Sequence, residues 1–156
     1  IDIDNYFTFE PGINEFKALC ENVKNNNNYN LGLDKTESTK NFYINEQDAD
    51  SSIVEPKIYN SIYKIKTTTL NKFFKKIKTE KIKLLKLEAE GYEPEILQGA
   101  NKILDKIEYI AIDGGYERGK NSEETLSSQL NFLLKNNFEI IEINLKWGRA
   151  LLKNKI

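Results

Sequence analysis

Short apolar segments alternate with amphipathic ones along this chain of 156 residues. Aromatic, β-branched or alternating apolar residues predict strands at 6–9, 29–33, 40–44, 63–68, 82–87, 109–112, 138–143 and 149–152. Apolar residues at three- and four-residue spacing predict helices after Asn14 and over 70–77, 94–104 and 123–135. Helices that alternate with apolar strands in this way imply an α/β fold: a mostly parallel sheet with helices on both faces.

Residues at the ends of the predicted helices support their boundaries. Pro94 suits a first helical turn, because an N–H is not needed there. Thr69 and Ser122 are expected to cap the helices over 70–77 and 123–135, and Asn14 to cap the first helix. Cys20 is expected in the core. The helix over 94–104 is predicted to bury an apolar stripe formed by Ile96, Leu97, Ala100, Ile103 and Leu104.

Composition narrows the class of protein. The formal net charge is −1, so no basic field indicates nucleic-acid binding. The single cysteine excludes an internal disulfide and favours a reducing compartment, so a cytoplasmic location is expected. No apolar stretch approaches the roughly 18 residues of a membrane span. The chain contains no histidine, which excludes histidine-based nucleophilic catalysis. The chain has no methionine and opens on Ile1, so it is expected to be one partial domain over 1–156.

The turn after the predicted strand 82–87 carries two glutamates, Glu88 and Glu90. Open α/β sheets bind ligands at the carboxyl ends of parallel strands. Carboxylates two residues apart on an extended segment project to the same side and repel each other unless a cation or a proton lies nearby. A cationic cofactor, or a substrate hydroxyl that gives up its proton to a base, could be the partner that relieves this repulsion. Alternatively, Glu90 caps the following helix and leaves Glu88 alone at the site.

Two further carboxylates end predicted strands. Glu10 closes the first strand and offers two acceptor oxygens, enough for both hydroxyls of a ribose; a solvated loop residue is the alternative. Asp113 follows the strand 109–112 and would lie at the same sheet edge as Glu88. The glycines after Asp113 permit a close approach of the backbone to a ligand. Nothing in the spacing of Asp113 and Glu88 favours a bound Mg²⁺, so no metal is predicted.

Two loops hold weaker candidates. Glu117 and Arg118 either form a local ion pair that fixes the loop or contact a substrate. Ser51 and Ser52 favour a polar turn, with contact to a cofactor or substrate as the alternative.

The run from Lys86 to Ala100, Lys-Leu-Glu-Ala-Glu-Gly-Tyr-Glu-Pro-Glu-Ile-Leu-Gln-Gly-Ala, resembles the signature of the FkbM family of S-adenosylmethionine-dependent methyltransferases. That signature has an acidic residue, one spacer, Glu, Gly and a helix that ends near Gly-Ala. The family commonly has Asp where this chain has Glu88. Phe9-Glu10-Pro11 and the turn from Asp113 to Gly119 are similar to other segments of the family, and the resemblance extends from Phe7 to about Leu152.

The resemblance implies a Rossmann-like class I methyltransferase fold that lacks its first, glycine-rich strand–helix unit. It implies S-adenosylmethionine as the cofactor and methyl transfer to an acceptor oxygen on a sugar or glycoconjugate, that is, a small-molecule or glycan acceptor. The implied catalytic residues are Glu88 and Asp113, and Glu10 and Glu88 would bind the cofactor. On the acceptor side the candidates are Glu90, Ser51, Ser52, Glu117 and Arg118. Alternatives are a truncated or degenerate non-catalytic domain, or a Rossmann-like domain that binds another nucleotide.

Overall fold

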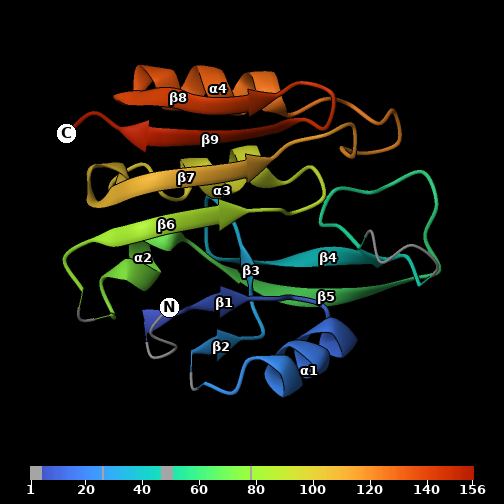
Figure 1. Cartoon of the computed structure of the whole chain (residues 1–156). Coiled ribbons are helices and arrows are strands. Elements are labelled where there is room, and N and C mark those ends of the chain that lie inside the picture. The colour runs from blue at the N-terminus through green and yellow to red at the C-terminus, as the bar shows by residue number, and fades with distance from the viewer. Residues whose placement is uncertain (1–4, 26, 47–50, 78) are drawn as a thin grey trace.

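A computed structural model describes residues 5–25, 27–46, 51–77 and 79–156 of the chain (Figure 1). The strands are β1 (Thr8–Phe9), β2 (Asn28–Tyr29), β3 (Gly32–Leu33), β4 (Ser38–Ile44), β5 (Ser61–Thr68), β6 (Ile82–Leu87), β7 (Ile107–Asp113), β8 (Phe138–Asn144) and β9 (Arg149–Asn154). The helices are α1 (Ile13–Asn22), α2 (Leu70–Phe74), α3 (Glu93–Gln98) and α4 (Leu126–Lys135), with a 3₁₀ turn η2 (Leu104–Lys106). The α/β class is therefore confirmed.

The strands form three sheets with the orders β1-β2, β3-β5-β4 and β6-β7-β9-β8. Parallel pairs are β1 with β2, β3 with β5, and β6 with β7. Antiparallel pairs are β4 with β5, β7 with β9, and β8 with β9. The sheets are therefore mixed, and the mostly parallel sheet that was predicted is not confirmed. The reason is local: two hairpins, β4–β5 and β8–β9, add antiparallel pairs, and β9 also pairs antiparallel with β7.

The β6-β7-β9-β8 sheet has a covered face and an open face. Figure 1 shows α3 and α4 behind this sheet, while the described helices leave its front face uncovered. Side-chain alternation along β7 agrees, because Ile110 and Ile112 are buried whereas Ala111 and Asp113 point to the other face and are only partly buried. Helices on both faces were expected, and the described helices cover one face of this sheet.

The core behind the sheet is built around α3 and the segment that follows it. All five residues of the predicted apolar stripe are buried: Ile96, Leu97, Ala100, Ile103 and Leu104. The helix itself ends at Gln98, earlier than predicted. A Cβ on Gly99 would lie 2.1 Å from the carbonyl oxygen of Asp34, so a neighbouring segment packs where a longer helix would place its side chains.

Three local predictions are wrong. Cys20 is exposed, because α1 lies at the edge of the molecule and buries no residue fully. The cap of α1 is Gly12 rather than Asn14. Helix α4 begins after Thr125, whereas Ser122 has a φ of 50° and belongs to the preceding turn. The cap predicted at Thr69 is confirmed, since its side chain accepts a hydrogen bond from the N–H of Lys72.

Strands β1 and β6 set the orientation of the candidate residues. Figure 1 shows both strands running in the same direction, so Glu10 and Glu88 follow strand ends on the same side of the molecule. The polar turn predicted at Ser51 and Ser52 follows residues 47–50, which lie outside the described residues. Among the helices that the structure describes, every one is too short or too polar to cross a bilayer.

Candidate functional site

The turn after β6 carries Glu88 and Glu90 away from the sheet. Its backbone is left-handed at two successive residues, with φ of 49° at Glu90 and 85° at Gly91. Residues other than glycine adopt this conformation rarely, because the Cβ approaches the backbone. The turn leads directly into α3, so Glu88 stays exposed at the sheet edge while Glu90 is half-buried.

Side chains from three segments hold this turn. Ser52 donates a hydrogen bond of 2.8 Å to the carbonyl of Glu90, and Arg118 donates to the carbonyl of Gly91. The carboxylate of Glu93 accepts from the N–H groups of Ala89 at 2.8 Å and Gly91 at 3.2 Å. The helix cap considered for Glu90 is not confirmed: Tyr92 is the N-cap of α3 and no side chain makes a capping hydrogen bond there, while Glu93 binds the turn before the helix.

The turn after β7 packs against the β8–β9 hairpin. The N–H of Gly114 donates to the carbonyl of Gly148 at 2.9 Å. A Cβ on Gly148 would lie 2.9 Å from the Cα of Gly115. The glycines after Asp113 thus allow close contact between two turns of the chain, whereas the sequence suggested contact with a ligand.

Glu88 and Asp113 lie in one cleft. Leu87 and Ile112 are partners in the register of the parallel pair β6–β7, so the next residue of each strand reaches the same edge. The cleft has a volume of about 460 Å³. Its lining comes from β6, β7, β8, β9 and the turns at their ends: Lys86, Leu87, Glu88, Ala111, Ile112, Asp113, Glu142, Asn144, Arg149, Ala150 and Leu151. The structure therefore brings together the two residues predicted to be catalytic.

Each of these two carboxylates has a cationic partner. Lys86 forms a close ion pair with Oε2 of Glu88, and Nε of Arg149 lies 2.7 Å from Oδ2 of Asp113. Sequence reasoning missed both cations. Alternation along β6 was a sufficient signal for Lys86, which lies two residues before Glu88 on the same face. Arg149 becomes recognisable only once β9 is known to pair with β7, since Asp113 and Arg149 are register partners.

Glu10 lies at the end of β1, outside the residues that line the cleft. Its Oε1 accepts a hydrogen bond of 2.7 Å from the N–H of Gly12. Burial raises the pKa of this carboxyl above its usual value, and the Gly12 hydrogen bond opposes that rise. The other oxygen, Oε2, has no hydrogen-bond partner among the described residues.

The candidate residues in the loops, Ser51, Ser52 and Arg118, form hydrogen bonds or ion pairs with other segments of the chain. Ser51 accepts a hydrogen bond from the N–H of Asn45, and Ser52 is buried against the Glu90 turn. Arg118 forms a bidentate pair with Glu95, at 2.9 and 2.7 Å. An ion pair that fixes the loop was one of the alternatives for Arg118, and its partner is Glu95, not the exposed Glu117.

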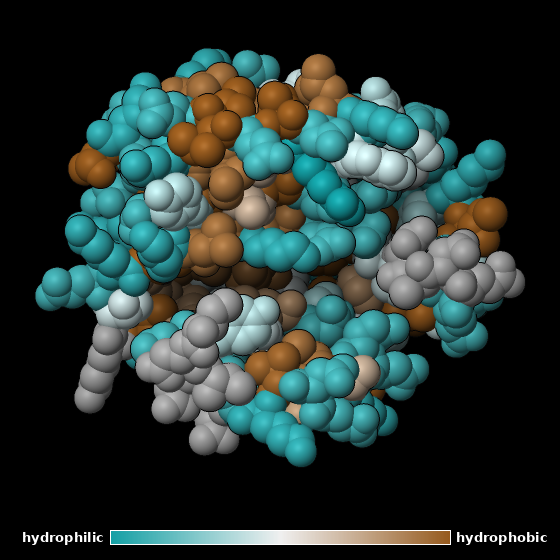
Figure 2. Space-filling view, viewed as in Figure 1, coloured by the Kyte–Doolittle hydropathy of each residue, from teal (hydrophilic) through white to brown (hydrophobic). Residues whose placement is uncertain are grey.

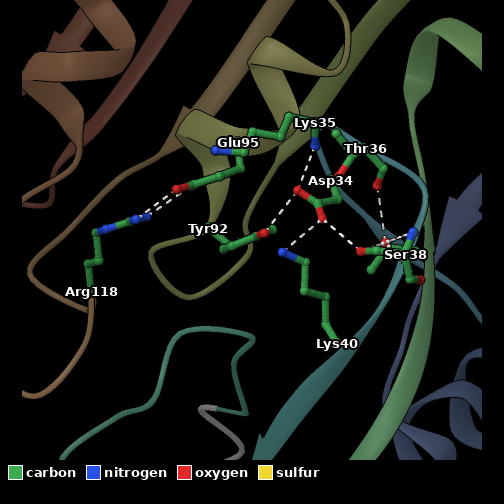
Figure 3. A network of polar contacts seen from close by, with 9 residues as sticks. Asp34, Lys35, Thr36, Ser38, Lys40, Tyr92, Glu95 and Arg118 are labelled. Atoms are coloured by element: carbon green, nitrogen blue, oxygen red, sulfur yellow. Dashed lines mark hydrogen bonds and ion pairs between the residues drawn. The ribbon is translucent and has the colours of Figure 1, made fainter.

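A buried polar network supports the start of α3 from behind (Figure 3). The fully buried carboxylate of Asp34 accepts a hydrogen bond of 2.9 Å from the hydroxyl of Tyr92. Lys40 lies 3.4 Å from the other oxygen of Asp34. Burial, together with the Asp34 carboxylate, raises the pKa of Tyr92 far above its usual value. No sequence motif indicated Asp34, because its partners are distant in the chain.

In the described part of the chain, no group of three or more histidine, cysteine, aspartate or glutamate side chains is arranged to hold a metal ion. Four of the charged side chains that line the cleft form two ion pairs, Lys86 with Glu88 and Arg149 with Asp113.

In this mixed α/β fold, carboxylates at the ends of two neighbouring parallel strands line one cleft. Proteins of the open α/β class bind ligands at such a sheet edge. A sequence model described as the Methyltransferase FkbM domain matches residues 3–143. The match covers most of the chain, so the chain belongs to the FkbM methyltransferase family. Searches of curated proteins and of solved structures gave no significant match.

Proposed function

We propose that this protein transfers a methyl group from S-adenosylmethionine to an acceptor oxygen on a sugar or glycoconjugate, using a Rossmann-like class I methyltransferase fold. Membership of the FkbM family supports methyl transfer in general. The observation that carries the finer proposal is the cleft in which Glu88 and Asp113 meet at the carboxyl ends of β6 and β7.

The charge of the cleft suits a cationic cofactor. Three carboxylates line it against two cations, so a positive charge that enters is attracted. S-Adenosylmethionine, when bound, supplies a methyl group on a positively charged sulfur. Glu10 is the proposed ribose ligand, because its Oε2 has no partner in the described structure and can accept from a hydroxyl.

The proposed catalytic base is Glu88 or Asp113. The acceptor oxygen forms a bond to the methyl carbon while the carbon–sulfur bond breaks, and the hydroxyl proton passes to one of these carboxylates. Lys86 contacts Oε2 of Glu88 and Arg149 contacts Oδ2 of Asp113, which leaves the second oxygen of each group for the proton. Alignment of the reacting groups can lower the barrier by about 7–11 kcal/mol.

Acceptor contacts remain predictions for Glu90, Ser51 and Glu117. For Ser52 and Arg118 we propose instead that the side chains shape the acceptor side of the site, because their polar groups already hold the turn after β6.

The first test is calorimetric titration of S-adenosylmethionine into the wild type, Glu10→Ala and Glu15→Ala. Glu15 is the matched control, since it is exposed and lies in the first turn of α1. Loss of hydrogen bonds to a charged acceptor should weaken binding about tenfold or more for Glu10→Ala only. Equal loss of affinity and thermal stability would contradict the role of Glu10. No binding to the wild type, or displacement by a dinucleotide, would contradict the proposed cofactor.

The second test separates chemistry from binding. Glu88→Gln and Asp113→Asn are assayed for methyl transfer to a panel of sugars and glycoconjugates, with cofactor affinity measured in parallel. Loss of the general base should lower kcat by about 10²–10⁴-fold in one of the two variants. Unchanged kcat in both would remove these carboxylates from the chemistry.

A further inference from the structure

The first turn of α3 is anchored to three distant segments. Figure 3 shows two of the anchors, Tyr92 with Asp34 and Glu95 with Arg118. Glu93 supplies the third, because its carboxylate lies 3.3 Å from the hydroxyl oxygen of Thr125 at the start of α4. Of these three side chains, only that of Glu93 also binds the turn that carries Glu88 and Glu90.

Glu93 is fully buried and surrounded by neutral donors. Its Oε1 accepts from the N–H groups of Ala89 and Gly91, and its Oε2 accepts from the hydroxyl of Thr125. No cationic side chain of the described structure forms an ion pair with it. One carboxylate thus fixes both amides that flank the left-handed residue Glu90.

The same network reaches the turn after β7. Thr125 accepts a hydrogen bond of 3.1 Å from Nε2 of Gln129. A Cβ on Gly114 would lie 2.4 Å from that nitrogen and 3.1 Å from the hydroxyl oxygen of Thr125. The N–H of Leu126 donates to the carbonyl of Gly114 at 3.0 Å. Glu93, Thr125 and Gln129 therefore contact the turns that follow β6 and β7, next to Glu88 and Asp113.

This arrangement is costly for a purely structural element. A buried carboxylate loses its hydration, and Oε1 of Gln129 is a buried acceptor without a hydrogen-bond partner among the described residues. Apolar side chains of similar volume would fill the same space without either cost. Costs of this kind are typical of sites where geometry matters to function.

We infer that Glu93 is a positioning residue which, through Thr125 and Gln129, fixes the turns after β6 and β7 so that Glu88 and Asp113 face one cleft. The catalytic consequence rests on the proposed methyl transfer. The geometric consequence does not, because it concerns only the backbone of residues 89–91 and 114.

Hydrogen exchange tests the geometry without any ligand. The variants are Glu93→Ala, Glu93→Gln and Thr125→Val, with Glu139→Gln as the control because Glu139 is exposed on β8. In Glu93→Ala, the amides of Ala89 and Gly91 should exchange about tenfold faster, while the Ile110 amide in the core strand β7 stays protected. Glu93→Gln should restore protection, since its side-chain oxygen can still accept. Thr125→Val should speed exchange of the Leu126 amide.

Two results would overturn the inference: unchanged exchange at Ala89 and Gly91 in Glu93→Ala, or equally faster exchange at Ile110, which would show a general loss of stability. Cofactor affinity and kcat of the same variants then test the catalytic part. Glu93→Ala should lower kcat and Glu93→Gln should recover it. If exchange behaves as expected but the wild type transfers no methyl group, the positioning role stands and the proposed function fails.

Discussion

Gly91 combines two features that exclude a side chain. Its φ is 85°, and a Cβ would lie 2.6 Å from the Cα of Arg118. The Cα of Arg118 is a backbone atom, which cannot move aside as a flexible side chain can. Steric contact and backbone conformation therefore act together at this residue, which lies next to Glu90 in the candidate site.

We predict that Gly91→Ala destabilises the protein more than Gly119→Ala. Gly119 has a comparable φ of 68°, but a Cβ there would lie 3.3 Å from a side-chain atom of Val54 and 3.9 Å from the carbonyl oxygen of Glu55, which is an ordinary contact distance. The backbone conformation alone should cost about 1 kcal/mol in either variant, and the clash with Arg118 should add to that cost only at Gly91. Urea unfolding of both variants checks this. Equal free energies of unfolding for the two variants would show that the turn at Gly91 shifts to accommodate the added methyl group at little cost.

The raised pKa of Glu93 predicts how the stability of the protein depends on pH. Burial raises the pKa of the Glu93 carboxyl above its usual value. Hydrogen bonds from neighbouring groups, among them the N–H groups of Ala89 and Gly91, reduce this rise without cancelling it. The folded state therefore holds this proton more tightly than the unfolded chain does. Its contribution to stability is complete below the ordinary glutamate pKa and is lost as pH rises through the raised value.

The stability of the wild type relative to Glu93→Gln should accordingly be higher at a pH of about 4 than at a pH of about 7. Denaturant unfolding of both proteins at the two pH values measures this difference, and other carboxylates cancel in the comparison. A difference that stays constant or grows with pH would mean that Glu93 ionises as readily in the folded protein as in the unfolded chain.

Among residues, the sequence identified those whose roles follow from strand ends. Glu88 and Asp113 were predicted because each follows an apolar strand, and the parallel register brings them together. Asp34, Thr125 and Gln129 carry no such signal, since their partners lie far away in the chain. Residues that position a site through tertiary contacts are therefore the ones that sequence reasoning misses.

At the level of elements, strands were predicted more reliably than helix ends. The spans of β6, β7 and β9 agree with prediction to within about two residues, which is the uncertainty of any such boundary. Helix α3 ends early because of the Gly99–Asp34 contact, and α4 begins late because the segment before it pairs Arg118 with Glu123. Both differences arise from contacts with distant segments, which override local preference.

The cap of α2 gives a prediction at this scale. Replacing Thr69 by Ala removes the acceptor for the Lys72 N–H and should destabilise the protein by about 1 kcal/mol. The control is Thr79→Ala, because the Thr79 hydroxyl is exposed and donates only to the nearby Lys81 carbonyl. Thermal unfolding of the two variants compares them. A larger loss for Thr79→Ala would contradict the importance of the cap.

Across the whole molecule, the front of the β6-β7-β9-β8 sheet stands out. Figure 2 shows apolar side chains on the upper part of this face and a hollow across the middle of the molecule. Strand β6 has a neighbour only on its β7 side in the described sheet, and Leu84 on this strand is 53% exposed. An unpaired strand beside exposed apolar groups favours self-association.

We therefore expect Leu84→Lys to reduce self-association at high protein concentration. Ile58→Lys is the control, because Ile58 is 64% exposed but lies in the loop before β5. Sedimentation velocity over a range of concentrations compares the variants with the wild type. If both lysines act equally, the effect reflects net charge and not the β6 edge.

In the turn after β6, the residues that hold the backbone differ from the residue that faces the cleft. This separation has a consequence for how the site changes during evolution. Ser52, Glu93 and Arg118 hold the backbone of this turn, whereas the exposed side chain of Glu88 forms an ion pair with the exposed Lys86. Substitutions at residue 88 should therefore alter reactivity at little expense to folding. A lineage can explore new chemistry at this residue while residues 52, 93 and 118 change rarely, or only together.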